Sequence, residues 1–79
     1  MSRNSEEPVY NRIEELRVSR AVTRQELAEQ VGVHYQTIGY LERGEYSPSL
    51  SLALRIAEAL NYDINEIFSI KPLKRRKEM

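Results

Sequence analysis

The stretch VGVHYQTIGYLERG, residues 31–44, carries the side chains of this sequence that are best suited to molecular recognition. At 100° per residue, Ile38 and Leu41 fall on one side of a helix, and polar and aromatic groups fall on the other. That other side holds Gln36, Gly39, Tyr40 and Arg43, with Tyr35 at its edge. A solvated helix face usually carries Glu, Lys and Ala, because nothing there compensates for the ordering of aromatic rings. We therefore expect this face to bind a partner.

The sequence offers little for catalysis. It has one histidine, His34, no cysteine, and no cluster of carboxylates with metal-ligand spacing, so neither disulfides nor a metal site are expected. No nucleophile stands beside a base, and no phosphate-binding loop is visible. A single small domain of 79 residues also has too small a core for a deep catalytic cleft. We expect no enzyme, no metal and no cofactor.

Charge is unevenly distributed along the chain, although the net charge is zero. Residues 1–70 hold seven Arg and eleven acidic residues, whereas residues 71–79, KPLKRRKEM, hold five basic residues and one acid. A body of this charge must bind DNA, if at all, through a few placed arginines rather than a broad positive field. No apolar run has the length of a membrane span, and MSRNSEEP lacks the apolar region of a signal peptide. We expect a cytoplasmic protein with no membrane partner.

Apolar residues recur at spacings of three and four, which predicts five helices and no strands. The first helix is expected over residues 8–20, because Pro8 suits a first helical position. The second begins after Thr23, which forms a capping box with Glu26, and it ends at Gly32 in a left-handed conformation. The apolar stripes of these two helices are expected to be Val9, Ile13 and Leu16, and Leu27, Ala28 and Val31.

The third helix is expected over residues 34–43. Ser49 is the predicted N-cap of the fourth helix, and Asn61 is expected to close it. Asp63 and Glu66 form a second capping box at the start of a short fifth helix. The buried stripe of the fourth helix is expected to be Leu50, Ala53, Leu54, Ala57 and Leu60.

These elements predict a folded domain over residues 9–70, between a flexible N-terminus of residues 1–8 and a basic tail of residues 71–79. Only Gly32 and Val33 separate the second helix from the third. A connection of this length sets two helices at a steep angle and presents the second one outward. Such a helix can enter the major groove of DNA.

The stretch TRQELAEQVGVHYQTIGYLERGEYSPSL, residues 23–50, resembles the helix-turn-helix of Cro and the phage repressors, which belong to the xenobiotic-response-element (XRE) family of regulators. LALRIAEALNYDINEIF is similar to the family's fourth and fifth helices, so the resemblance covers residues 11–68. The resemblance implies an all-α, five-helix, lambda-repressor-like DNA-binding domain whose third helix lies in the major groove. The family's packing positions are matched by Ala28, Gly32, Ile38 and Leu41.

The same resemblance implies roles for individual residues. Gln36 can pair with the N6 and N7 atoms of adenine, and a tyrosine can reach a phosphate or lie against a thymine methyl. Gly39 costs about 1 kcal/mol inside a helix, which is understandable if the backbone approaches the DNA closely. The implied base contacts are Tyr35, Gln36, Thr37 and Tyr40. The implied phosphate contacts are Arg24, Arg43, His34, Gly39, Tyr46 and Ser47.

Two structural expectations complete the site. In the family, a glutamate at the position of Glu42 pairs with a basic residue of the first helix, here Arg17. Arg12 and Arg20 are expected to be solvated, with a DNA contact of either as the alternative. The C-terminal part holds more apolar residues than a small bundle can bury, which favours a homodimer on a palindromic operator. The expected dimer contacts are Tyr62, Ile64, Ile67, Phe68 and Ile70, with Leu73 beside them.

The leading functional hypothesis is a sequence-specific transcriptional regulator, by default a repressor, whose partner is double-stranded DNA. The alternative is an antitoxin or adaptor that kept the fold and binds another protein. For the individual residues, a structural alternative is that Tyr35 and Tyr40 are half-buried core or dimer residues and that His34 is an ordinary helix-start residue. The basic tail could be solvated or could add non-specific DNA affinity. No effector domain follows the module, so no small-molecule effector is expected.

Overall fold

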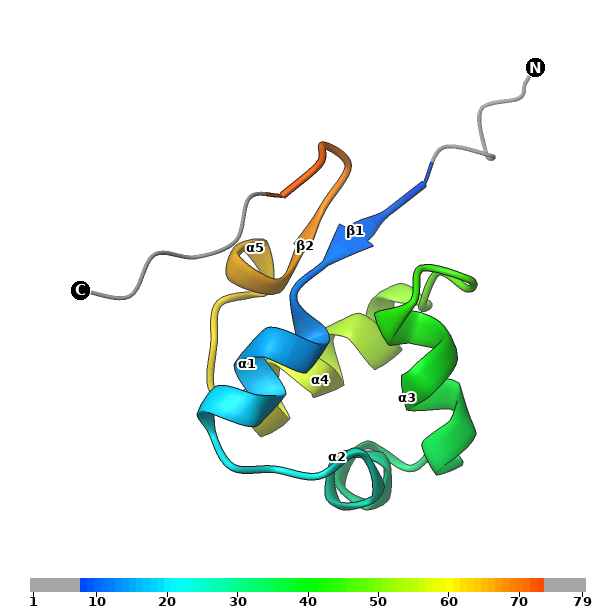
Figure 1. The fold of residues 1–79 in the computed structure, drawn as a ribbon, viewed down its shortest axis with the longest axis vertical. Coiled ribbons are helices and arrows are strands. Elements are labelled where there is room, and N and C mark those ends of the chain that lie inside the picture. The colour runs from blue at the N-terminus through cyan, green and yellow to red at the C-terminus, as the bar shows by residue number, and fades with distance from the viewer. Residues whose placement is uncertain (1–7, 74–79) are drawn as a thin grey trace.

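The computed structural model describes residues 8–73 and contains five helices and one two-stranded sheet (Figure 1). In chain order the elements are β1 (Tyr10–Asn11), α1 (Ile13–Ser19), α2 (Arg24–Val31), α3 (Tyr35–Glu42), α4 (Leu50–Leu60), α5 (Ile64–Ile67) and β2 (Phe68–Ser69). The five helices confirm the predicted fold class. The expectations for a flexible N-terminus and a basic tail fall largely on residues 1–7 and 74–79, outside the described residues.

The prediction of no strands is wrong. β1 pairs antiparallel with β2, with Tyr10 opposite Ser69 and Asn11 opposite Phe68 (Figure 1). This sheet brings the first and last described elements of the chain together. Strands of two residues are too short for an alternating pattern to reveal them.

The first helix also starts later than predicted, at Ile13 instead of Pro8. The Asn11 side chain explains the difference, because its Oδ1 accepts a hydrogen bond from the Ile13 amide at 2.9 Å and so satisfies a donor at the helix start. The Arg12 amide is turned away from the helix and donates to the carbonyl of Ile67 at 2.8 Å. Tyr10 and Asn11, which were expected to lie in the first helical turn, therefore pair with β2 instead.

One hydrophobic core joins all five helices. Ile13 and Leu16 of α1 and the stripe predicted for α2 contribute to it. Val9 was expected in the first stripe but lies before α1 and is half-buried outside this core. Leu50 and Leu54 of α4 are exposed, contrary to prediction. The Leu-Ser-Leu-Ala-Leu sequence at the start of α4 places leucines on two faces of the helix, so either face could be turned toward the core. In the structure, the face with Leu52 and Ile56 is buried. The buried apolar side chains of the described residues are Ile13, Leu16, Leu27, Ala28, Val31, Ile38, Leu41, Leu52, Ala53, Ile56, Ala57, Leu60 and Ile67.

The predicted caps of α2, α4 and α5 are confirmed. Both capping boxes are complete, the Ser49 hydroxyl accepts a hydrogen bond from the Leu52 amide, and two left-handed residues end α2 and α4. The left-handed residues are Gly32, with φ of 79°, and Asn61, with φ of 60°. Local sequence therefore determines where α2, α4 and α5 begin and where α2 and α4 end.

Arg20 is exposed, as predicted, but its side chain also contacts the protein. Its Nε and Nη2 atoms donate to the carbonyls of Leu60 and Asn61, each at 2.9 Å, and its guanidinium lies 4.2 Å from the centre of the Tyr62 ring. These contacts satisfy carbonyl groups at the C-terminal end of α4, where a positive charge is favourable. Arg12 likewise donates from Nη1 to the Glu66 carbonyl, at 3.0 Å. Both arginines therefore tie α1 to the C-terminal half of the fold.

The second and third helices have the arrangement expected of a helix-turn-helix. In Figure 1, α2 is seen nearly end-on while α3 is seen from the side, so the two cross steeply. α3 packs mainly against α2 and lies at the edge of the molecule (Figure 1). Among the helices of residues 8–73, none is long and apolar enough to cross a membrane.

Candidate nucleic-acid interface

α3 buries one face and leaves a face of large polar side chains outside. Ile38 and Leu41 are buried in the core, whereas Tyr35 is 51 % exposed and Tyr40 is 45 % exposed. Gln36 is exposed between them, and the neighbouring Thr37 is half-buried. The tyrosines are therefore not core residues of the monomer. Their hydroxyl groups and the Gln36 amide offer donors and acceptors on one surface.

His34 fixes the start of this helix. Its Nδ1 accepts a hydrogen bond from the Gln36 amide at 3.1 Å, so the imidazole acts as the N-cap. The same ring stacks on Tyr35, with 4.9 Å between the ring centres. The histidine thus orders both the first helical turn and the first tyrosine of the outward face.

Glu42, at the end of α3, holds two arginines from two other helices. Its side chain is 2 % exposed, and its Oε2 accepts from the Nε of Arg17 at 2.7 Å. Its Oε1 accepts from the Nε of Arg24, also at 2.7 Å. Arg17 is buried and donates in addition from Nη1 to the Val22 carbonyl at 3.0 Å. The structure therefore brings the expected pair together and adds a third partner that sequence reasoning missed.

Both arginines expected to contact phosphates also contact carboxylates of this chain. The hydrogen bond and charge of Glu42 raise the pKa of Arg24, whose Nη2 is 3.9 Å from the more distant Glu14. A hydrogen bond from Arg43 Nε to Glu45 at 3.0 Å similarly raises the pKa of Arg43. The Arg43 guanidinium lies 5.3 Å from the centre of the Tyr40 ring. Glu14 and Glu45 were not expected at the site, although Glu45 is close to Arg43 in sequence.

Gly39 lies differently from the prediction. It was expected on the open outer face, but it is buried because the Arg43 side chain covers it. A Cβ at this position would lie 3.3 Å from Arg43 Nη1, which is closer than an ordinary van der Waals contact. The glycine therefore leaves room for the arginine.

All the expected DNA-contacting residues except His34 and Ser47 line two shallow hollows. Arg24, at the start of α2, and Arg43, at the end of α3, both border the first, which has a volume of about 200 Å³. The second hollow, of about 430 Å³, lies between the end of α3 and the loop that follows, where Tyr46 and Ser47 are exposed. The first is lined by Arg24, Tyr35, Gln36, Gly39, Tyr40 and Arg43, and the second by Thr37, Tyr40, Glu45 and Tyr46.

Guanidinium, amide and phenol groups around open hollows suit recognition of phosphate oxygens and base edges. No group of three His, Cys, Asp or Glu side chains that could hold a metal ion occurs in the part of the chain that the structure describes.

The helix-turn-helix family HTH_3, of Cro and C1 type, matches residues 13–67, which include every helix.

The chain belongs to this helix-turn-helix family. Its members include transcriptional regulators with a DNA-binding fold. An uncharacterized HTH-type transcriptional regulator from Methanothermobacter thermautotrophicus is 56 % identical over 57 residues, which cover 71 % of this chain and 83 % of the relative. Another from Archaeoglobus fulgidus is 49 % identical over 57 residues, covering 72 % of this chain and 80 % of that protein.

A solved structure agrees with this assignment. The restriction-modification controller protein C.AhdI from Aeromonas hydrophila superposes with a TM-score of 0.65 and 31 % sequence identity. The superposition covers 68 % of this chain and 82 % of the controller protein. The helix-turn-helix fold of this family is therefore shared beyond close sequence relatives.

The expected dimer contacts of this helix-turn-helix protein do not all lie on its surface. Ile67 is 0 % exposed and packs in the core, so the prediction that it lies on an exposed apolar surface is wrong. α5 is short and its last residue points inward, which sequence spacing alone did not reveal. Tyr62 is half-buried beneath Arg20, and its hydroxyl is 3.1 Å from that of Ser19.

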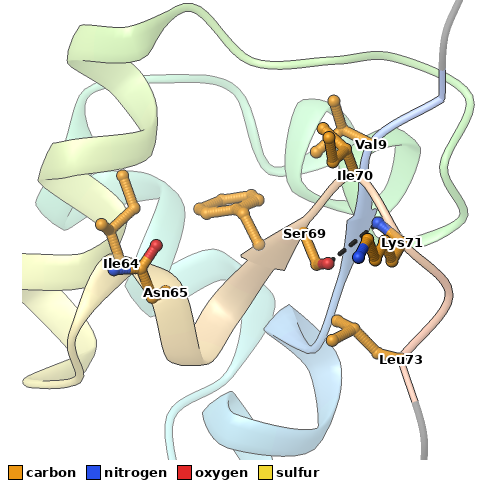
Figure 2. Close-up of a pocket in the computed structure, with 8 residues that line it drawn as sticks. Val9, Ile64, Asn65, Ser69, Ile70, Lys71 and Leu73 are labelled. Atoms are coloured by element: carbon orange, nitrogen blue, oxygen red, sulfur yellow. Dashed lines mark hydrogen bonds between the residues drawn. The ribbon is translucent and has the colours of Figure 1, made fainter.

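An open apolar groove remains beside β2, and we call it the C-terminal groove (Figure 2). It has a volume of about 540 Å³ and includes three of the expected dimer residues, Ile64, Phe68 and Ile70. Ile70 is 62 % exposed. The complete lining is Val9, Ile64, Asn65, Phe68, Ser69, Ile70, Lys71 and Leu73.

Proposed function

We propose that this protein is a sequence-specific transcriptional regulator that acts in the cytoplasm and represses genes as a homodimer on a palindromic operator. The observation that carries the proposal is the outward face of α3, where two tyrosines and a glutamine are exposed while the opposite face is buried. An α-helix of this kind fits the major groove and places such groups against base edges.

The proposed contacts divide into base readout and positioning on the backbone. Tyr35, Gln36, Thr37 and Tyr40 would meet base edges, with the Gln36 amide suited to adenine. Phosphate contacts would come from the ends of α2 and α3 and from the following loop. We assign them to Arg24, His34, Gly39, Arg43, Tyr46 and Ser47, with Gly39 acting by making room for Arg43.

The C-terminal groove supports the homodimer. Isolated exposed side chains are ordinary, but an open apolar groove beside two short strands is a surface that association would cover. A single small module also buries too little surface for high sequence specificity. A two-fold dimer with recognition helices about 34 Å apart, one turn of B-DNA, would require a palindromic site.

Substitution of Gln36 by Ala tests base readout. We expect the variant to keep its thermal stability within about 0.5 kcal/mol, because Gln36 is an exposed side chain. It should lose about 1 to 3 kcal/mol of binding free energy on the preferred operator and relax the preference at one or two base pairs per half-site. The measurement is a binding selection on randomised duplexes, with melting curves of each protein.

Gln30→Ala is the matched control, since Gln30 is an exposed amide on α2 that lines neither of the two hollows. It should select the same sequence as the parent. If Gln36→Ala also selects the parent's sequence equally well, or loses binding only by unfolding, α3 does not read bases. The net acidic character of residues 1–70 would then favour an antitoxin or adaptor that binds a protein partner.

A further inference from the structure

We propose that Glu42 is a positioning residue for DNA binding. Its carboxylate accepts a hydrogen bond from the Nε atom of Arg24, so that the outer edge of the Arg24 guanidinium, formed by Nη1 and Nη2, faces a backbone phosphate. The inference rests on the proposed function. It assigns to a buried carboxylate of the recognition helix a role in orienting a cation on the preceding helix.

The Glu42 carboxylate is itself fixed in place. It is nearly inaccessible to solvent, and its Oε2 is bonded to Arg17, a buried side chain that also donates to the Val22 carbonyl. One carboxylate oxygen is thus occupied by α1, and only Oε1 faces Arg24 at 2.7 Å. A carboxylate bonded on one side to a buried arginine has little freedom to rotate, so it defines the direction of the bond on the other side.

Arg24 meets this fixed acceptor through Nε, not through its terminal nitrogens. The guanidinium is a planar fork, so fixing Nε determines where Nη1 and Nη2 point. Its side chain is 46 % exposed, and Nη2 is 3.9 Å from Glu14, which is longer than a hydrogen bond. The outer edge of the fork therefore remains accessible to an anion from solvent.

The hollow of about 200 Å³ beside this edge is bordered by a second arginine held in the same way. Arg43 is also bonded to a carboxylate through Nε, that of Glu45, at 3.0 Å. Arg24 is close enough to Arg43 for their like charges to interact unfavourably. An anion in the hollow they share relieves that repulsion, and a DNA phosphate bound there can accept hydrogen bonds from both guanidinium groups.

Positioning and simple electrostatics predict opposite results for Glu42→Gln. If only charge matters, removal of a negative group near the DNA strengthens binding. If Glu42 orients Arg24, the amide leaves one of the two Nε donors without an acceptor, and binding weakens. We expect the dissociation constant on a labelled duplex, chosen by the parent protein from randomised DNA, to rise about tenfold.

Arg24→Lys tests the same geometry without disturbing the buried Arg17 contact. Lysine keeps the charge but has no Nε fork to be aligned. We expect it to weaken binding about tenfold while keeping most of the salt dependence, whereas Arg24→Ala should also lower the slope of log K against log salt by about 1. Glu14→Gln is the matched control, because it removes the other nearby carboxylate and should not weaken binding.

A double-mutant cycle separates positioning from loss of fold. Each variant is measured below its melting transition, and Glu42→Gln should cost much less affinity in the Arg24→Ala background than alone. If Glu42→Gln does not fold, the affinity of Arg24→Lys tests the positioning role in its place. Parent-like binding by Arg24→Lys, or an equal effect of Glu42→Gln in both backgrounds, overturns the positioning role and leaves the proposed function intact. If the parent protein binds no duplex in the selection from randomised DNA, both proposals are overturned.

Discussion

At the scale of single residues, Glu42 is the point where α1, α2 and α3 are joined. Its pair with Arg17 could be anticipated from family resemblance, but the Arg24 bond could not, because the family resemblance suggested only a phosphate contact for that position. The distances between α2 and the end of α3 are set by core packing, not by spacing in sequence. Glu14 and Glu45 were missed for the same reason, since acidic residues on predicted surface positions are usually solvated.

The Arg17 and Glu42 pair should contribute strongly to stability. Both side chains are almost fully buried, and Glu42→Gln leaves the Arg17 charge buried without a carboxylate, so we expect it to cost about 3 to 5 kcal/mol of unfolding free energy. Arg17→Met should cost less, because Arg24 still pairs with the Glu42 carboxylate. The double variant should cost less than the sum of the two. Urea denaturation of the four proteins measures this coupling.

The exposed pair of Arg43 and Glu45 provides the control cycle. Its geometry is similar, with 3.0 Å between Nε and Oε2, but both side chains are more than half exposed. Solvent should screen the interaction and leave a much smaller coupling. Equal coupling in the two cycles would contradict the importance of burial at Glu42.

At the scale of elements, the sequence predicts helix ends better than helix faces. Thr23 with Glu26, and Gly32 after α2, act through neighbouring backbone groups, so their roles can be inferred from a few residues. The buried face of α4 depends on what lies across the core, and both of its leucine stripes satisfy helical periodicity. The outward face of α3 was predictable because only one of its faces is apolar enough to be buried.

The turn between α1 and α2 contains a strained residue whose replacement should stabilise the protein. Ala21 has a φ of 58°, in the left-handed region that disfavours side chains with a Cβ. Ala21→Gly should raise the unfolding free energy by about 0.5 to 1 kcal/mol, because relief of strain exceeds the greater entropy of the unfolded glycine. Thermal and urea unfolding would show this gain.

Ala59→Gly is the matched control, because Ala59 lies inside α4. Glycine there should lower stability by about 1 kcal/mol. A loss of stability at both positions would show that the backbone at Ala21 is not strained.

At the scale of the whole molecule, the two candidate surfaces lie on different helices and strands, and they approach each other where Val9 and Leu73 line a hollow with Arg43. α3 lies on one side of the fold, while α5 and β2 lie on the side away from α2 (Figure 1). One surface can therefore contact DNA while the other contacts a second copy. The sequence suggested this division, because its unusual polar face and its excess of apolar residues lie in different segments. It did not show that Ile67 is buried in the core.

The C-terminal groove should form the contact between two copies. Ile70 is the expected dimer residue that is most exposed, so Ile70→Asp should place a charge in the contact without opening the core. Analytical ultracentrifugation at micromolar concentration should give twice the monomer mass for the parent and a shift toward the monomer for the variant. Operator binding should weaken in parallel, because each half-site would be bound without the other.

Leu54→Asp is the control, since Leu54 is half-exposed on α4 and outside the groove, and it should leave the mass unchanged. A parent that sediments as a monomer and binds one half-site at full affinity would contradict the two-fold arrangement, while equal dissociation by both aspartate variants would place the contact elsewhere.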